Sequence, residues 1–201
     1  IIDLSSAGHQ PMFSDCSNYS IVFNGEVYNH LDLRKKLPIG IKFNGHSDTE
    51  TILYYLIHNG IEGLKDLNGI FAIAFLDIRK QNLIIARDPF GVKPLYFFEE
   101  GSSFIFSSEI RPIQYLINKK EIDKDSLASL LKLRYNASPF SLFKSIKKVR
   151  PGEYISINIK EKFEKKTSNY AINSVFKIND IGFDDALKIY EKNLEQAVKR
   201  Q

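Results

Sequence analysis

The sequence has 201 residues, of which 43% are hydrophobic and 26% charged, with a net charge of +4. This composition is ordinary for a globular protein, so a core of normal size is expected and no disulfide staples are needed. Cys16 is the single cysteine, which excludes an internal disulfide, and no apolar run approaches the ~20 residues of a membrane span. We therefore expect a cytoplasmic protein that does not bind a membrane.

The first third of the chain predicts one strand and two helices. Tyr19–Phe23 is β-branched and aromatic, as strands are, and it runs into a polar break at Asn24-Gly25-Glu26. His30–Leu37 fits a short helix that Pro38 stops. Asp48 has the residue type of an N-cap and precedes an apolar run, so it is predicted to open a second helix that ends at Gly60.

The middle of the chain predicts consecutive strands. Gly69–Asp77 and Asn82–Ala86 are almost continuously apolar, which is expected when both faces of a sheet are covered. Pro94–Glu99 and Ser103–Ser107 add two strands around a glycine turn. Helices followed by hairpin strands favour an α+β fold with antiparallel sheet over a doubly wound parallel one.

The last third predicts a helix at Asp123–Leu133 and an alternating strand at Glu153–Ile159. Glu161–Asp180 is polar without a clear period, which is typical of a linker. Phe183–Gln201 carries an apolar stripe at helical spacing and is predicted to be a helix with few partners nearby in the sequence.

Two further patterns suggest no site. Between Lys144 and Lys166 lysines are crowded, but no nucleic-acid-binding motif accompanies them, so a solvated surface is the better interpretation and no nucleic acid is expected. The histidines lie scattered without metal-ligand spacing, so we predict no metal site. These are His9, His30, His46 and His58.

Seven short motifs, in order, give the chain a resemblance to a known family. They are Ile1–Leu4, Gly8–Met12, Asn24–His30, Ser47–Glu50, Ala86–Tyr96, Ser107–Ile110 and Val149–Gly152. Together they resemble the glutamine-dependent asparagine synthetases over nearly the whole chain, most weakly between Glu161 and Asp180.

The resemblance implies a domain organisation. Residues 1–160 would form a class II glutamine amidotransferase domain, a four-layer αββα sandwich of the N-terminal-nucleophile hydrolase type, truncated at its N-terminus by about 50 residues. Residues 161–181 would be a linker, and 182–201 the first helix of an ATP-dependent asparagine synthetase domain. The enzyme would hydrolyse L-glutamine to glutamate and ammonia and pass the ammonia to that second domain, which amidates aspartate using ATP and Mg²⁺. The resemblance leaves a homodimer open.

The nucleophile implied by the resemblance is a cysteine at the mature N-terminus whose own α-amine acts as base. It would lie upstream of Ile1, so the chain alone should be inactive. Cys16 follows Asp15 and has no free amine, so it is not a substitute.

The remaining site residues also come from the resemblance. Asn24 and Gly25 match an oxyanion pair, a side-chain amide and a backbone N–H that stabilise the tetrahedral intermediate; an ordinary Asn-Gly turn is the alternative. Asp48, with Glu26 nearby, would bind the α-ammonium of glutamine; helix capping is the alternative for Asp48. Ile1 and Ile2 would line the pocket or simply pack in the core.

Arg87 and Asp88 start a Pro- and Gly-containing turn and are expected to form a supporting ion pair without a catalytic role. Two rival functions stay open. One is an amidotransferase of the same family that modifies a surface sugar. The other is a non-catalytic glutamine-binding module, if no cysteine precedes the chain.

Overall fold

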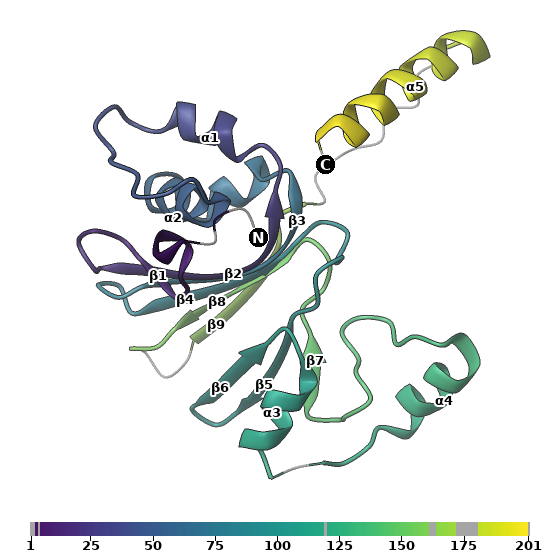
Figure 1. The fold of residues 1–201 in the computed structure, drawn as a ribbon. Coiled ribbons are helices and arrows are strands. Elements are labelled where there is room, and N and C mark those ends of the chain that lie inside the picture. The colour runs from purple at the N-terminus through teal and green to yellow at the C-terminus, as the bar shows by residue number, and fades with distance from the viewer. Residues whose placement is uncertain (1–2, 4, 119, 161–163, 172–180, 201) are drawn as a thin grey trace.

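Two antiparallel sheets form the centre of the protein in the computed structural model, which describes residues 3, 5–118, 120–160, 164–171 and 181–200 (Figure 1). The larger sheet has the strand order β1-β2-β3-β4-β8-β9 and the smaller one the order β6-β5-β7. The strands are β1 Met12–Phe13, β2 Tyr19–Val27, β3 Gly69–Asp77, β4 Asn82–Arg87, β5 Tyr96–Glu100, β6 Ser103–Ser107, β7 Ile146–Lys148, β8 Glu153–Asn158 and β9 Glu164–Asn169.

Helices lie on the outer faces of the sheets: α1 and α2 cover the larger sheet, and α3 lies against the smaller one (Figure 1). The helices are η1 Ser6–Gly8, α1 His30–Lys36, α2 Asp48–Asn59, η2 Gly60–Asp66, α3 Ile110–Leu116, α4 Lys124–Leu133 and α5 Phe183–Arg200. Helix α5 extends away from both sheets and has no buried residue (Figure 1). The predicted α+β class with antiparallel sheet is confirmed.

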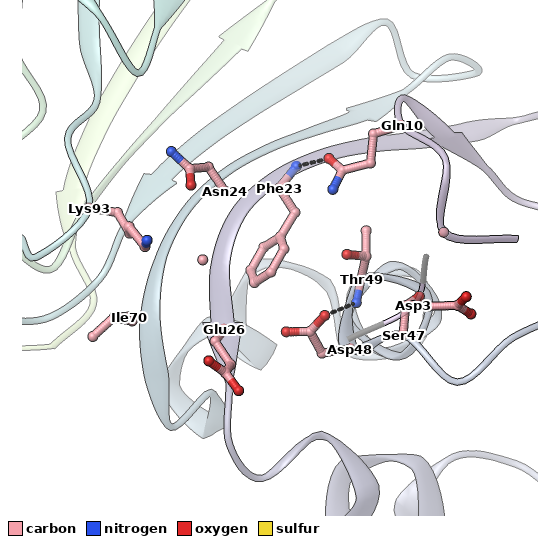
Figure 2. A pocket seen from close by; sticks show the side chains of 12 residues that line it. Asp3, Gln10, Phe23, Asn24, Glu26, Ser47, Asp48, Thr49, Ile70 and Lys93 are labelled. Carbon is pink, nitrogen blue, oxygen red and sulfur yellow. Dashed lines mark hydrogen bonds between the residues drawn. The ribbon is translucent and has the colours of Figure 1, made fainter. Parts of the chain in front are cut away.

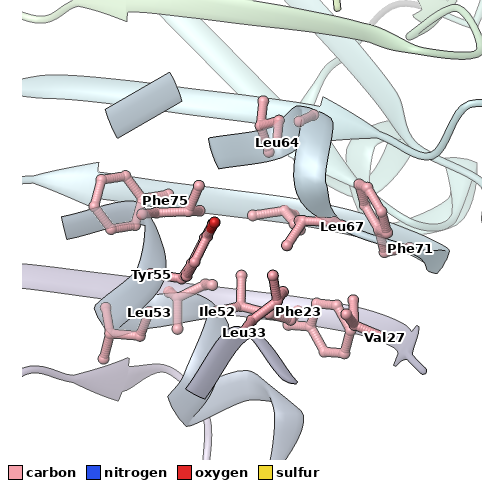
Figure 3. Close-up of a cluster of buried hydrophobic side chains, with 14 of the residues drawn as sticks. Phe23, Val27, Leu33, Ile52, Leu53, Tyr55, Leu64, Leu67, Phe71 and Phe75 are labelled. Carbon is pink, nitrogen blue, oxygen red and sulfur yellow. The ribbon is translucent and has the colours of Figure 1, made fainter. Parts of the chain in front are cut away.

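The largest hydrophobic cluster lies between the helices and the larger sheet (Figure 3). Ile52 and Leu53 of α2 pack onto Phe71 and Phe75 of β3, and the first three of these side chains are fully buried. Each such side chain contributes about 1.5–3 kcal/mol of hydrophobic stabilisation. This cluster fixes α2, and therefore its N-terminus, against the sheet.

Two further clusters cover the remaining faces. Ala72 and Ala74 of β3 pack with Ile85 and Phe97 between the two sheets. Because β3 also contributes to the helix-side cluster, its residues are buried on both faces, as its unbroken apolar sequence predicts. On the outer face of the smaller sheet, α3 buries Ile113 and Ile117 against Phe98 and Ile146.

The predicted end of β2 is wrong. The strand does not break at Asn24-Gly25-Glu26 but continues to Val27, paired with β3 throughout. A glycine at position 25 permits this pairing, because a Cβ there would lie 2.1 Å from the carbonyl oxygen of Ile70. The missing side chain thus makes room for the neighbouring strand.

The predicted linker over residues 161–181 is also wrong for part of its length. Glu164–Asn169 forms β9, which pairs with β8 at the edge of the larger sheet. Tyr170 is then buried in the helix-side cluster, and its hydroxyl donates to the carbonyl of Arg87 over 2.7 Å. A polar, lysine-containing sequence is compatible with an edge strand, where charge discourages pairing with another molecule.

The start of α2 differs from the prediction by one residue. Ser47, not Asp48, is the N-cap, since its hydroxyl accepts a hydrogen bond from the Glu50 N–H. Asp48 is the first helical residue, and its carboxylate is therefore available for other contacts. The end of the helix at Gly60 is as predicted.

Candidate functional site

A cavity of about 450 Å³ lies where β2 extends beyond the short strand β1 (Figure 2). It is bounded by the end of β2, the N-terminus of α2, and the loops that precede β1 and follow β4. The residues that line it are Asp3, Gly8, Gln10, Phe23, Asn24, Gly25, Glu26, Ser47, Asp48, Thr49, Ile70 and Lys93.

The exposed edge of β2 presents a row of backbone N–H groups to this cavity. Strand β1 pairs only as far as Ile21, so the N–H groups beyond it need other acceptors. The Phe23 N–H donates to the side-chain oxygen of Gln10 over 2.6 Å, and the Val27 N–H donates to Oδ2 of Asp48 over 3.0 Å. The side chains of Gln10 and Asp48 thus accept hydrogen bonds from two of these backbone N–H groups.

Gly25 lies between these two capped donors. Its partner on β3 is Phe71, whose own N–H and carbonyl are bonded to Asp88 at the end of β4. In an antiparallel ladder this makes Gly25–Phe71 a pair without mutual hydrogen bonds, so the Gly25 N–H points away from β3. No described residue provides an acceptor for it. The edge therefore holds one donor that is directed at the cavity and not satisfied by the described part of the protein.

Asp48 places a buried carboxylate at the cavity wall; its residue is 5% exposed. Its oxygens accept from the N–H groups of Val27 and Thr49 (Figure 2 draws the second bond). An ionised carboxylate offers about four acceptor positions, so roughly half of its capacity is unused. No ion pair among the described residues includes Asp48. Because buried charges are normally paired, this carboxylate can accept a cationic group of a ligand.

Asn24 reaches the cavity from the other face of β2. Side chains alternate along a strand, and Phe23 packs on the helix side, so Asn24 points toward the smaller sheet. There its amide nitrogen donates to the Ser108 hydroxyl over 3.0 Å. An amide group has two N–H donors, and one of them remains available. Asn24 and Asp48 line one cavity although they approach it from opposite faces of the strand.

The structure therefore brings Asn24, Gly25, Glu26 and Asp48 together, and Glu26 is an exposed member of the cavity wall. Ile1 and Ile2 lie outside the described residues. The close contact with β3 by itself requires that position 25 lack a Cβ.

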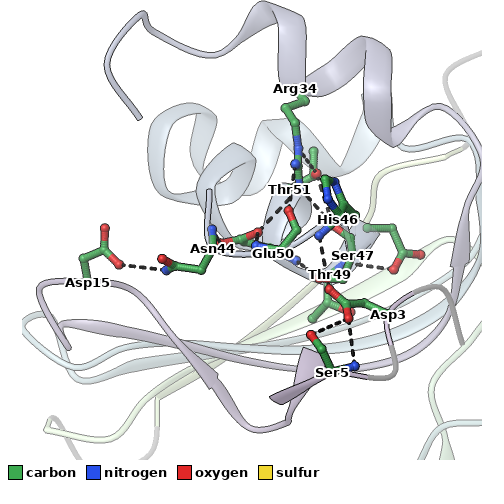
Figure 4. A network of polar contacts seen from close by, with 12 residues as sticks. Asp3, Ser5, Asp15, Arg34, Asn44, His46, Ser47, Thr49, Glu50 and Thr51 are labelled. Atoms are coloured by element: carbon green, nitrogen blue, oxygen red, sulfur yellow. Dashed lines mark hydrogen bonds and ion pairs between the residues drawn. The ribbon is translucent and has the colours of Figure 1, made fainter. Parts of the chain in front are cut away.

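The sequence-based site missed several lining residues, notably Asp3, Gln10 and Lys93. Gln10 and Lys93 belong to motifs that were recognised, but nothing in those motifs shows that they face a cavity. Asp3 accepts hydrogen bonds from the N–H groups of Ser5 and His46 (Figure 4). These bonds lower the pKa of the Asp3 carboxyl, the bonds to Ser5 most strongly. Asp3 thus links the N-terminal segment to the loop that precedes α2.

The loop before α2 is held by a second carboxylate (Figure 4). Glu50 accepts from the N–H groups of Asn44 and Gly45 over 2.7 and 3.0 Å, and it forms an ion pair with Arg34 at 3.6 Å. The charge of Glu50 is therefore paired within the fold, in contrast to that of Asp48 two residues earlier.

The predicted ion pair between Arg87 and Asp88 does not form, although both residues are buried. Arg87 donates to the carbonyl oxygens of Gly91, Lys93 and Val149, and burial lowers the pKa of its guanidinium. Asp88 accepts instead from backbone N–H groups. Each residue satisfies its charge with main-chain groups, most of which belong to the turn that follows the two residues.

The carboxylates of this site also act on the imidazole of His30. Burial lowers the pKa of its imidazole, and the nearby carboxylates of Asp48 and Glu26 oppose that shift. Its Nδ1 atom is buried without a hydrogen-bond partner.

Cys16 is exposed and is not among the cavity-lining residues. A hydrogen bond with Ser14 lowers the pKa of its thiol. Among the described residues no cluster of three His, Cys, Asp or Glu side chains could hold a metal ion. No described helix is long and apolar enough to cross a membrane.

Comparison with known proteins gives a consistent family match. Residues 1–171 match the family described as glutamine amidotransferase domain. The chain is 37% identical to asparagine synthetase 1 (glutamine-hydrolyzing) of Bacillus subtilis (strain 168) over 158 residues, which is 78% of this chain and 25% of that protein. It is 34% identical to a putative asparagine synthetase 2 of Methanocaldococcus jannaschii, over 83% of this chain and 35% of that protein.

Other matches carry different names. Amidase chry2 of Gibberella zeae is 31% identical over 82% of this chain and 24% of that protein. The chain thus spans about a quarter to a third of these relatives. Among solved structures, the glutamine phosphoribosylpyrophosphate amidotransferase of B. subtilis matches with a TM-score of 0.53 and 22% identity, over 82% of this chain and 32% of that one. This likeness shows a shared fold.

Proposed function

The chain belongs to the family of class II glutamine amidotransferase domains, and on that premise we propose that its cavity binds L-glutamine and hydrolyses the side-chain amide to glutamate and ammonia. The observation that carries this proposal is that two groups with unused hydrogen-bonding capacity lie in one cavity. Gly25 supplies a backbone donor without an acceptor among the described residues, and Asp48 supplies a buried carboxylate with spare capacity. Glutamine has a carbonyl oxygen for the first and an α-ammonium for the second.

The reaction divides between this chain and an upstream nucleophile. The thiolate of an N-terminal cysteine, which the family resemblance implies, would add to the amide carbon and place negative charge on the amide oxygen. The Gly25 N–H and the free amide N–H of Asn24 would stabilise that charge, and Ser108 would hold the Asn24 side chain. The α-amine of that cysteine, which would have taken the thiol proton, would give this proton to the amide nitrogen as the C–N bond breaks, so that ammonia leaves and a thioester remains. Water then cleaves the C–S bond of the thioester, which yields glutamate and restores the thiol.

The architecture supports the finer assignment to a four-layer αββα sandwich. Three hydrophobic clusters follow one another from the α1/α2 side, through the two sheets, to α3. We place the end of this domain near residue 171, because Tyr170 still belongs to the core.

We further propose that the ammonia is used by an ATP-dependent synthetase domain that amidates aspartate. Relatives that bear the asparagine synthetase name support this, and so does α5, whose residues Phe183, Leu187, Tyr190, Leu194 and Val198 are apolar and exposed. In this proposal ATP and Mg²⁺ would be held by the synthetase domain.

The test is Asn24→Ala in the full-length protein. Losing one oxyanion donor lowers kcat for glutamate release by about 10²–10³-fold, while the KM for glutamine changes little. Asn44→Ala, at an exposed position outside the cavity, is the matched control and should leave both constants unchanged. Equal losses in kcat and binding would remove Asn24 from the oxyanion role. Absence of glutamate release by the unmodified protein would favour the non-catalytic module.

A further inference from the structure

Lys93 is the one basic side chain among the described residues that line the cavity, whose other charged members are Asp3, Glu26 and Asp48. It is partly buried, and none of the ion pairs or side-chain hydrogen bonds of the described residues involves its ammonium group. Figure 2 shows the ammonium of Lys93 and the carboxylate of Asp48 on opposite sides of strand β2. The Asp48 side of β2 is therefore acidic, while Lys93 shares the Asn24 side with Glu26, which follows Asn24 by two positions and forms no ion pair with Lys93 among the described residues.

The backbone of Lys93 is fixed from two directions. Its N–H donates to Oδ2 of Asp88 over 3.0 Å, and its carbonyl accepts from Nε of Arg87 over 2.7 Å. Both partners are buried, Asp88 completely. Buried charged groups are costly unless their hydrogen bonds are made, so these two bonds hold the backbone of Lys93 in place. A side chain that starts from a fixed backbone loses less conformational freedom when it binds a ligand.

The charge pattern matches the two ends of the substrate. The α-ammonium of glutamine belongs near Asp48, and its side-chain amide belongs near Gly25 and Asn24. Figure 2 shows the Lys93 ammonium on the side of β2 to which the Asn24 side chain points. The amide end is neutral in glutamine, gains negative charge during hydrolysis, and is a carboxylate in the product glutamate.

We propose that Lys93 is a catalytic residue whose ammonium contacts the side-chain end of the substrate, stabilises the developing negative charge, and afterwards binds the γ-carboxylate of glutamate. This rests on the proposed glutaminase function and adds a charged group to the two neutral donors. A fixed positive charge discriminates between a carboxylate and an amide of the same shape, so its removal weakens glutamate binding more than glutamine binding.

The experiment compares Lys93→Gln and Lys93→Arg in the full-length protein, with Lys42→Gln as control because Lys42 is exposed and does not line the cavity. We measure the affinity for L-glutamate by calorimetry, and kcat and KM for L-glutamine. Lys93→Gln should weaken glutamate binding about tenfold and lower kcat about tenfold, with KM for glutamine changed less than about twofold. Lys93→Arg should recover most of both losses, and Lys42→Gln should change none of them.

Equal weakening of glutamate and glutamine binding by Lys93→Gln would overturn the proposal, because a packing role has no preference for charge. Glutamate affinity that does not change in Lys93→Gln, or that falls equally in Lys93→Arg, would also overturn it. If the unmodified protein hydrolyses no glutamine, the proposed function fails, and the calorimetric comparison still decides whether Lys93 binds the carboxylate.

Discussion

Asp48 and Asp88 are both buried, 5% and 0% exposed, and neither forms an ion pair within the described residues. They differ in how their oxygens are used. Asp88 accepts from the N–H groups of Phe71, Phe90, Val92 and Lys93, which fills its acceptor positions. Asp48 accepts from only two N–H groups and borders the cavity.

This difference in hydrogen bonding distinguishes a carboxylate that stabilises the fold from a carboxylate that can bind a ligand. Both have their charge stabilised by backbone dipoles, and Asp48 also benefits from its place at the N-terminus of α2. In Asp88 the stabilisation is complete, so the residue serves the turn that it closes. In Asp48 it is incomplete, and the remaining capacity is directed at a space where a ligand can supply the missing partner.

Asp88→Asn should give the largest loss of stability among these variants. The substitution removes the charge and replaces one acceptor by an N–H donor, which leaves backbone donors in a buried site unsatisfied. We expect a loss of at least about 3 kcal/mol in the free energy of unfolding, measured by denaturant titration. Asp32→Asn, at an exposed position, is the control and should stay within about 0.5 kcal/mol. If Asp88→Asn lowered the free energy of unfolding only slightly, Asp88 would not have the structural role that distinguishes it from Asp48.

Asp48→Asn tests whether the carboxylate of Asp48 binds the ligand. It should weaken glutamine binding about 100-fold, because the α-ammonium loses a buried charged partner, while unfolding free energy falls by only about 1 kcal/mol. The measurements are KM for glutamine and the same denaturant titration. The comparison breaks if Asp48→Asn destabilises the fold as much as Asp88→Asn, or if it leaves glutamine binding intact.

Ser47→Ala should give the smallest effect, and it separates helix capping from ligand binding at the N-terminus of α2. Ser47 caps α2, so its loss should cost about 1 kcal/mol of stability with little change in KM for glutamine. Asp123→Ala, which removes the cap of α4, gives a matched loss at a helix that does not border this cavity. A large rise in KM for Ser47→Ala alone would mean that capping and binding are not separate at this helix end.

Most of the fold could be predicted, because its core elements have strong periodic patterns. Gly69–Asp77 and Ser103–Ser107 have the predicted bounds, since long apolar runs flanked by turns leave little choice. The failures fell on two polar strands and on short elements that were not predicted, among them α3 and β7. Strand β9 is polar because one of its sides meets solvent, and the end of β2 is polar because it borders the cavity. Local sequence alone does not distinguish such strands from loops.

The sequence motifs predicted which residues come together in the site, but not how these residues are arranged. Asn24, Gly25, Glu26 and Asp48 are together in space, as the resemblance implied, but their geometry was not visible. The side chain of Gln10 caps a donor in β2 across 13 positions of sequence, and such a contact depends on the tertiary fold. The supposed Arg87–Asp88 pair failed for the same reason, because both residues found backbone partners that neighbouring sequence does not reveal.

Tyr170 has a practical consequence for where the polypeptide can be divided. A recombinant domain that stops at residue 160 would lose β9, leave the hydrogen-bonding groups of β8 open to solvent, and remove an aromatic ring from the helix-side cluster. Such a product would tend to self-associate through the uncovered strand. Ending the domain beyond Ala171 keeps the sheet edge charged and the ring in place, which makes that boundary the better one for expressing the domain by itself.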